Sequence, residues 1–393
     1  MNSSELRNPP ALVLFLALCV VLAIVEGSCY AVVRVLASKD AVYQPLAPRG
    51  VAHYLQVRDP LLGWPSPQAF GTAPLDSSGA RLLPAFPQPG KACVSTYGDS
   101  FVFGDEVSAA DAWSNQLALR LGCRVANYGV NGYGTDQAYL RFHALQADES
   151  SYVVLGVFTN DIVRNVNQLR NLLAPAHEVG LKPRFDIDAH GALYLLPLPS
   201  FPTEQLEDVI RRPEQYLEDE YFVPGGPAGV VRASFPYSLT ILRALWSYKL
   251  YAVLQNKSPY ADFYAEQHPS RALPITVGIC QKFIDEATTR NKSALVVMFP
   301  SRNDLEAFAG QGRWIYQPLI DGLIRKGVTV LNLGPHLLAS LHGREPAALF
   351  KQRHYNEEGN RLVAQALEQA LRALPDRGHA RLPELPATSR ARP

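Results

Sequence analysis

The stretch GDSFVFG at residues 98–104 holds the first residue type that could carry covalent chemistry. Ser100 follows Gly98 and Asp99 directly, and a short β-prone run precedes all three. A serine hydroxyl becomes a useful nucleophile only when a neighbouring base accepts its proton. Gly, Asp and Ser are also the commonest turn residues, so an ordinary turn between a strand and a helix fits this stretch equally well. The rest of the chain must supply a base and a site for the developing negative charge.

Three further polar clusters follow apolar segments or open an expected helix. They are the glycine-rich loop NYGVNGYGT at 127–135, TND at 159–161 and HYNEEGNRLVA at 354–364. His354 stands at the start of the last expected helix, far along the chain from Ser100. A histidine that reached the serine could take its proton and later return it to a leaving alcohol. We therefore regard His354 as the candidate base.

The elements that must position these clusters alternate along the chain. We expect strands in ACVSTY, CRVANY, SYVVLGVF, SALVVMFP and VTVLNLG, with segments of helical periodicity between and after them. Strands and helices that alternate with short loops are typical of a parallel sheet covered by helices. Functional residues of such sheets gather at the carboxyl ends of the strands. We therefore expect a three-layer α/β/α fold in which the polar clusters meet at one edge of the sheet.

Taken in order, GDSFVFG, NYGVNGYGTDQ, TND and HYNEEGNRLVA resemble the sequence blocks of the SGNH/GDSL hydrolase superfamily. The resemblance covers residues 45–372, and DPLLGW at 59–64 is similar to an element of the bacterial, membrane-anchored branch of that superfamily. It implies a flavodoxin-like α/β/α core and acyl transfer through Ser100 as nucleophile and His354 as base. It implies no metal and no organic cofactor.

The resemblance also assigns the donors that would stabilise an oxyanion. They are the backbone N–H of Ser100, the backbone N–H of Gly132 and the side-chain amide of Asn160. Preorganised donors of this kind act on the charge that develops in the transition state. Glycine at 132 would let the backbone approach the substrate closely, and the Asn160 amide donates without titrating. The plain structural alternative for Asn160 is a helix N-cap.

The sequence departs from the family pattern at the acid that orients the histidine. The family has an aspartate two or three residues before the histidine, where this chain has Gln352 and Lys351. Three possibilities follow. His354 is held by Gln352 or a backbone carbonyl, an acidic group from elsewhere such as Glu345 fills the gap, or the site is impaired and the protein binds without catalysis.

Residues 11–33, ALVLFLALCVVLAIVEGSCYAVV, carry a single charge at Glu26. About 20 apolar residues in a helix cross a bilayer, so the length is sufficient. We favour an uncleaved anchor over a signal peptide, because the run is long and no small-residue cleavage site follows it. Arg7 and Arg34 flank the run, so the positive-inside bias is weak. We expect the N-terminus in the cytoplasm and the catalytic part on the periplasmic or extracellular face.

Composition divides the chain into four parts. Residues 1–37 form the cytoplasmic tip and the anchor, and the Pro/Gly-rich residues 38–91 pack on the catalytic domain or lead to it. Residues 92–372 form the catalytic domain, with an insertion at about 165–270 that would cap or shape the site. The Pro/Arg-rich residues 373–393 are expected to be disordered.

Charge and cysteine usage exclude several function classes. The net charge of +1 argues against a nucleic-acid partner. The chain has no C-x-x-C pair and no H-E-x-x-H, so its motifs predict no metal site. A disulfide between Cys93 and Cys123 is possible in an oxidising compartment, but we expect two small buried thiols.

The sequence therefore predicts a membrane-anchored serine esterase that removes or transfers a small acyl group, such as acetyl, on a carbohydrate or lipid. The N-terminal helix would hold it in the membrane. The alternatives are a polysaccharide O-acetyltransferase and a catalytically impaired binding or assembly protein.

Overall fold

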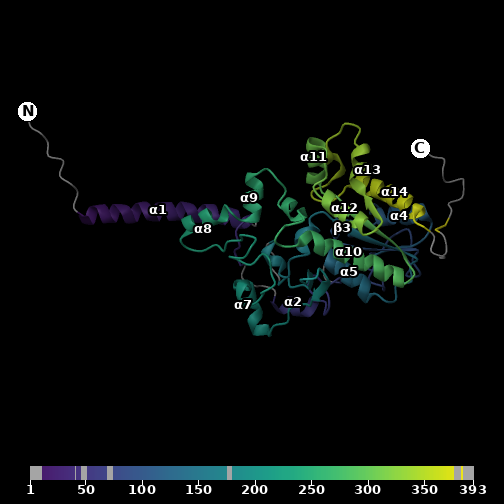
Figure 1. Cartoon of the computed structure of the whole chain (residues 1–393), viewed down its shortest axis with the longest axis horizontal. Helices are drawn as coiled ribbons and strands as arrows, with labels where there is room; N and C mark the ends of the chain where they lie inside the picture. The colour runs from purple at the N-terminus through teal and green to yellow at the C-terminus, as the bar shows by residue number, and fades with distance from the viewer. Residues whose placement is uncertain are drawn as a thin grey trace, which may run out of the picture.

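The computed structural model describes residues 11–39, 41–45, 51–68, 74–174, 179–375 and 382–383. Figure 1 shows one long helix, α1 (Ala11–Ser38), that projects away from the rest of the chain. The expected cytoplasmic tip before α1 lies outside the described residues. So does most of the expected disordered tail, apart from residues 373–375 and 382–383.

Five parallel strands form the central sheet, in the order β2-β1-β3-β6-β7. Their bounds are β1 Val94–Tyr97, β2 Val125–Asn127, β3 Tyr152–Phe158, β6 Ser293–Phe299 and β7 Val330–Asn332. The runs YVVLGVF and SALVVMF are apolar throughout because β3 and β6 are covered on both faces. The expected three-layer fold with a central parallel sheet is confirmed, and this strand order is the flavodoxin-like one.

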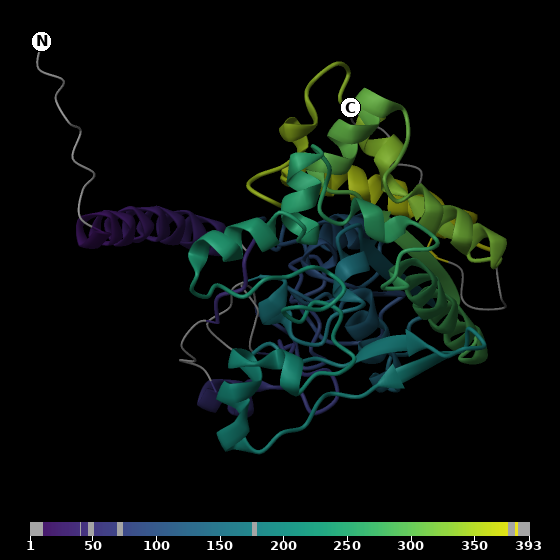
Figure 2. The same cartoon turned by 60° about the vertical axis from the view of Figure 1, so that its left-hand side comes forward.

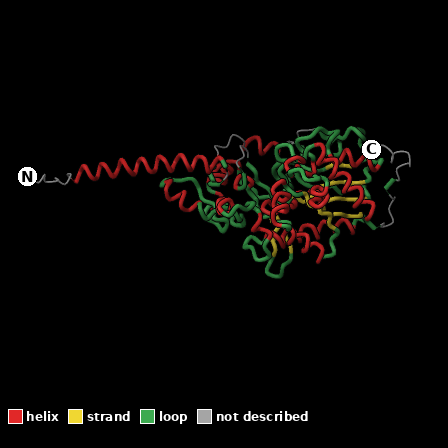
Figure 3. The backbone as a smooth tube through the Cα atoms, turned by 90° about the horizontal axis from the view of Figure 1, so that it is seen from above, coloured by secondary structure: helices red, strands yellow, loops and turns green. Residues whose placement is uncertain are grey.

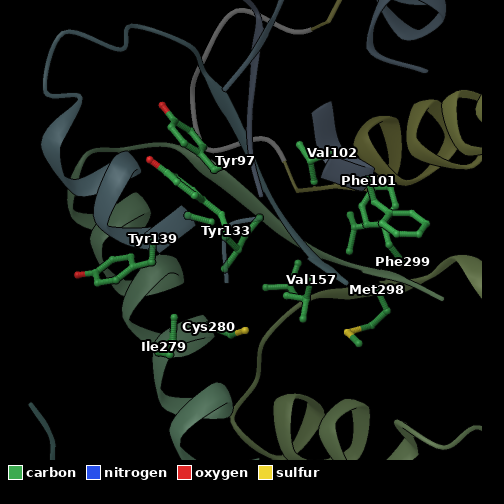
Figure 4. Close-up of a cluster of buried hydrophobic side chains, with 14 of the residues drawn as sticks. Tyr97, Phe101, Val102, Tyr133, Tyr139, Val157, Ile279, Cys280, Met298 and Phe299 are labelled. Carbon is green, nitrogen blue, oxygen red and sulfur yellow. The ribbon is translucent and has the colours of Figure 1, made fainter. Parts of the chain in front are cut away.

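Helices cover both faces of the sheet, as Figure 3 shows from above. On one face α14 contacts both α4 and α13, and on the other α10 contacts both α5 and α12. Their bounds are α4 Trp113–Leu121, α5 Thr135–Ala144, α10 Ala272–Thr289, α12 Gln317–Arg325, α13 Leu333–Ala339 and α14 Glu357–Ala373. Figure 4 shows part of the core, in which Met298 and Phe299 of β6 and Cys280 of α10 are among the buried side chains.

Shorter elements occupy the loops. Their bounds are α2 Val51–Val57, α3 Ser100–Phe103, α6 Asp161–Arg164, β4 Arg184–Ile187, β5 Leu193–Leu196, α7 Leu206–Arg211, α8 Tyr237–Ala244, α9 Tyr248–Leu254 and α11 Arg302–Gln311. Between α6 and α10, the described residues add no strand to the central sheet. They form the antiparallel β4–β5 hairpin, visible as paired arrows in Figure 2, and the helices α7, α8 and α9. This region corresponds in position to the expected insertion.

α1 is long and apolar enough to cross a bilayer. Its most apolar 18-residue window has a mean hydropathy of 2.6, and none of that window is buried. By length and composition it suits either a membrane anchor or a signal sequence. The C-terminal half of α1 contacts α8, which lies beside it (Figure 1).

Cys93 and Cys123 form a disulfide, with Cα atoms 6.1 Å apart. The expectation of two free thiols was wrong. Cys93 directly precedes β1 and Cys123 lies just before β2, and the pairing of these adjacent strands brings the two residues together. Both residues are half-buried, so neither behaves as a core thiol.

Candidate active site

Ser100 is the first residue of α3, which begins directly after β1. Asp99 caps this helix, because its carboxylate accepts a hydrogen bond from the Phe101 N–H at 2.9 Å. A side chain at position 98 would not fit, since a Cβ on Gly98 would lie 2.2 Å from Cγ2 of Val102. The tight turn places Ser100 at the carboxyl edge of the sheet, where 7% of its surface is exposed.

His354 lies in the loop before α14 and reaches the serine across the sheet edge. Its Nε2 is 2.8 Å from Oγ of Ser100. Asn356 holds this loop, because its Nδ2 donates to the Ala348 carbonyl at 2.7 Å. The imidazole also packs against the Phe101 ring, with centroids 4.8 Å apart. The structure therefore brings the predicted nucleophile and the predicted base into hydrogen-bond contact.

The carboxylate beside the histidine belongs to Glu106, in the loop after α3. Its Oε1 is 2.9 Å from Nδ1 of His354, and its Oε2 accepts from the backbone N–H groups of Gln352 and Arg353 at 2.9 and 3.1 Å. Partial burial raises the pKa of Glu106, but the hydrogen bonds from His354 and from these N–H groups outweigh it and lower the pKa to about 2. Glu106 is therefore a carboxylate at neutral pH.

The backbone at Glu106 is strained. Its φ of 67° lies in the left-handed region, which is costly for a residue with a side chain. Such residues persist where the surrounding contacts over-determine the conformation, and they concentrate at functional sites. Here the contacts to the His354 loop hold the strained residue in place.

Glu106 corrects the expectation for the missing family acid. Gln352 is exposed and contributes only its backbone N–H, which binds Glu106. Glu345 is exposed and precedes a short 3₁₀ turn, so it does not fill the gap. Lys351 pairs with Glu357 at 2.6 Å, at the start of α14. An acidic group from elsewhere does stand beside His354, but its sequence position was predicted wrongly.

Three donors at the carboxyl ends of β1, β2 and β3 have no acceptor among the described residues. They are the backbone N–H of Ser100, the backbone N–H of Gly132 and the side-chain amide of Asn160. Gly132 has a φ of 87°, a conformation that glycine adopts without strain. Asn160 occupies the N-cap position of α6 but makes no side-chain capping bond. The three donors predicted for an oxyanion therefore remain available to a ligand.

A buried ion cluster ties these turns together. Arg164 donates to Asp99 at 3.1 Å, to Asp161 at 2.8 Å and to the Tyr133 carbonyl at 2.8 Å. Burial, and after it the charge of Asp99, raise the pKa of Asp161 well above its ordinary value. The cluster joins the Ser100 turn, the glycine-rich loop and α6, so both aspartates have a positioning role.

Arg81, from the Pro/Gly-rich segment, holds the loop that carries Glu106. Its buried guanidinium donates to the carbonyls of Phe103, Gly104 and Val107, the last two at 2.7 and 3.0 Å. Burial lowers the pKa of Arg81 to about 10, which leaves it charged at neutral pH. These carbonyls lie before and after Glu106 in the chain, so the bonds from Arg81 hold the Glu106 loop in place.

The DPLLGW stretch lies beside the glycine-rich loop. A Cβ on Gly132 would lie 3.6 Å from the Trp64 ring, which is itself buried. Gln137 of α5 donates to the carbonyls of Leu62 and Trp64 at 2.8 and 2.9 Å. Trp64 is therefore a packing residue that supports the loop of Gly132.

Sequence reasoning missed Glu106 and Arg81. The signal for Glu106 was the acidic pair Asp105–Glu106 directly after Gly104, a few residues beyond the nucleophile. The family pattern places this acid shortly before the histidine instead.

In the described part of the chain, no group of three His, Cys, Asp or Glu side chains is arranged to hold a metal ion.

No family model matches the chain, and no curated protein matches it. Solved structures with similar folds include a lipolytic protein of the G-D-S-L family from Desulfitobacterium hafniense, at 13% identity and a TM-score of 0.34 over 71% of this chain and 98% of that one. A G-D-S-L family member from Veillonella parvula matches at 12% and 0.34, over 70% and 96%. The acetylxylan esterase Axe2 from Geobacillus stearothermophilus matches at 10% and 0.38, over 72% and 95%. At such TM-scores the similarity is not evidence of function, which depends here on the geometry of the site.

Proposed function

We propose that this chain is a serine esterase of the SGNH/GDSL type that works through an acyl-serine intermediate. The observation that carries the proposal is the continuous hydrogen-bonded chain from Ser100 through His354 to Glu106, with contacts of 2.8 and 2.9 Å. A serine, a base and a group that orients the base are the arrangement that activates a hydroxyl. The complete set argues against an impaired binding protein.

The proton positions follow from the partners of the imidazole. Glu106 is ionised and can only accept, so Nδ1 of His354 carries the hydrogen and donates it. Nε2 then has a free lone pair toward the Ser100 hydroxyl. This tautomer, assigned from the hydrogen-bond network, is the one that a general base requires.

Acylation begins when Nε2 of His354 takes the Ser100 proton and Oγ bonds to the carbonyl carbon of the ester. The carbonyl oxygen becomes an oxyanion, for which the N–H groups of Ser100 and Gly132 and the amide of Asn160 are the proposed donors. The tetrahedral intermediate collapses as the carbon–oxygen bond to the alcohol breaks. His354 gives its proton to the departing alcohol.

Deacylation repeats these steps with water. His354 takes a proton from the water as its oxygen bonds to the acyl carbon. The bond to Oγ then breaks, Ser100 recovers its proton and a carboxylic acid leaves. If a sugar hydroxyl replaced water, the same site would act as an O-acetyltransferase.

The proposed substrate is a small acyl ester, such as an acetyl ester, on a carbohydrate or lipid. We place the catalytic part outside the cytoplasm, with α1 as its membrane anchor. The Cys93–Cys123 disulfide supports this location, because disulfides persist mainly in oxidising compartments.

The test is hydrolysis of p-nitrophenyl acetate by the full chain in detergent, compared with Ser100→Ala and His354→Ala. Both variants should lose turnover, and a fluorophosphonate probe should label the parent protein at Ser100 only. Turnover that survives Ser100→Ala would refute the proposed nucleophile. Probe labelling without hydrolysis, followed by acetyl transfer to an added oligosaccharide, would favour the transferase.

A further inference from the structure

The segment that contains the helices α8 and α9 carries a concentration of exposed apolar side chains. Outside α1, thirteen large apolar side chains are exposed in the described residues, and eight of them lie between residues 235 and 254. We define the apolar face by the five that are more than half exposed: Phe235 (71%), Leu242 (59%), Trp246 (74%), Val253 (64%) and Leu254 (65%). An exposed patch of this kind on one segment indicates a binding surface.

This segment is attached to the membrane helix by specific contacts. The Glu26 carboxylate accepts hydrogen bonds from the Tyr237 N–H at 2.6 Å and from the backbone and hydroxyl of Ser238, so it caps the start of α8. The rings of Tyr30 and Tyr237 lie 5.0 Å apart. Further on, Val33 and Ala244 are fully buried against each other's helices in a small apolar cluster. α8 therefore runs alongside α1, from Glu26 toward the end of α1 that joins the rest of the chain.

In an α1 that spans the bilayer, the position of Glu26 places the start of α8 at membrane depth. The residues from Ala11 to Val25 would span only about 22 Å as a helix, less than the roughly 30 Å of a hydrocarbon core. A spanning α1 must therefore bring Glu26 into the bilayer, and Tyr237 and Ser238 enter with it. Neither an isolated carboxylate nor the free N–H groups of a helix end is stable in hydrocarbon. The hydrogen bonds between Glu26 and α8 satisfy both groups at once.

The charges of the segment suit the surface of an anionic bilayer. Residues 221–261 contain no Asp or Glu and four cations, Arg232, Arg243, Lys249 and Lys257. Two of the four pair with acids just outside this range, Arg232 with Glu214 and Lys257 with Asp262. Arg243 is exposed and has no partner among the described residues, so its guanidinium is free to reach a phosphate. Trp246 follows the C-terminal end of α8, on the side nearer the soluble part, and tryptophan is enriched at the membrane–water interface.

We propose that α8 and α9 are embedded in the outer leaflet beside α1, with the apolar face in contact with phospholipid and Phe235 deeper than Trp246. The protein would then be held at the bilayer by two neighbouring elements rather than by one helix. Because α8 and α9 belong to the region between α6 and α10, this attachment would keep the candidate site at the membrane surface. The proposal rests on α1 as the proposed membrane anchor and on the proposed outward orientation, but not on the esterase activity.

The test uses tryptophan fluorescence, because the chain offers a clean probe. It has four tryptophans, and Trp64, Trp113 and Trp314 are all buried while Trp246 is exposed. The full chain would be reconstituted in vesicles of phosphatidylcholine and phosphatidylglycerol, with or without bromine on the acyl chains. The difference in emission between the parent protein and Trp246→Phe gives the fluorescence of Trp246. We expect brominated lipid to quench this fluorescence and acrylamide in the water not to quench it.

The position of the bromine on the acyl chain tests depth, and substitutions on the apolar face test the contact with lipid. Trp246 should be quenched more by bromine near the headgroup than by bromine near the chain end. A Phe235→Trp substitution in the Trp246→Phe background should reverse that order. Leu242→Glu should reduce quenching of Trp246 by brominated lipid, whereas the matched control Ile324→Glu, at an exposed site on α12, should not.

Two results would overturn the proposal. Trp246 quenched by acrylamide and not by brominated lipid would show that the face lies in water. Trp246 protected from both quenchers would show that protein covers it, as a second copy of the chain or another partner would.

Discussion

Oε1 of Glu106 lies 2.9 Å from Nδ1 of His354, although the two residues are 248 positions apart in the chain. Glu106 follows the nucleophile turn and His354 precedes the last helix, so the contact joins the first and last parts of the α/β domain. Three backbone N–H groups of the His354 loop also bind this carboxylate, those of Gln352, Arg353 and His354. One acidic side chain thus both orients the base and fastens the loop that carries it.

Replacing Glu106 should therefore damage catalysis severely. We expect Glu106→Gln to lower kcat by about 10²- to 10⁴-fold, because the imidazole would lose its orienting anion and the stabilisation of its protonated form. Steady-state hydrolysis of p-nitrophenyl acetate measures the effect. Glu345→Gln and Gln352→Ala are matched controls that should keep near-parental kcat. If Glu345→Gln were the damaging change, the assignment of Glu106 would be wrong.

The contact should also leave a signature in the pH dependence of stability. The pKa of Glu106 is about 2 in the folded chain, below its ordinary 4.5, so its ionised form is favoured by folding. This contribution is fully present above the ordinary pKa and is lost as the pH falls from 4.5 to 2. Thermal unfolding in detergent should show the parent protein above Glu106→Gln in Tm at neutral pH, with the gap closing across that window. A gap that is the same at pH 2 and at neutral pH would contradict this account.

Removal of the Asn160 amide tests the proposed oxyanion donors. We expect Asn160→Ala to lower kcat by about 10²- to 10³-fold with little change in KM, since the bond would form mainly in the transition state. Active-site titration with a fluorophosphonate controls for folding, because the variant should still be labelled to completion at Ser100. A rise in KM with an unchanged kcat would instead assign Asn160 to ordinary substrate binding.

Arg81 should act through Glu106 rather than on the substrate. Arg81→Met removes three bonds to the carbonyls around Glu106, and we expect a loss of kcat of about tenfold or more. A double-mutant cycle measures the coupling. In the Glu106→Gln background, Arg81→Met should cost much less than it costs alone. Full additivity of the two losses would show that Arg81 affects catalysis by another route.

The sequence by itself determined the layers of the fold and most of the residues of the candidate site. Apolar runs such as YVVLGVF are typical of strands buried on both faces, and their alternation with amphipathic segments indicates a parallel sheet. The carboxyl ends of parallel strands all lie at one edge of the sheet. A short motif that follows a strand can therefore be placed at that edge from the sequence. Ser100 and Asn160 could be placed in this way.

Only the tertiary structure decided which acid stands beside His354, that Cys93 and Cys123 are joined, and that Glu26 caps α8. Each of these contacts links residues that are distant in sequence or lie in loops. Loops have no hydrophobic periodicity from which the direction of a side chain could be predicted. Glu106 reaches the histidine because Arg81 and the strained backbone at Glu106 set the path of its loop. Such contacts depend on packing between segments, which local sequence patterns do not encode.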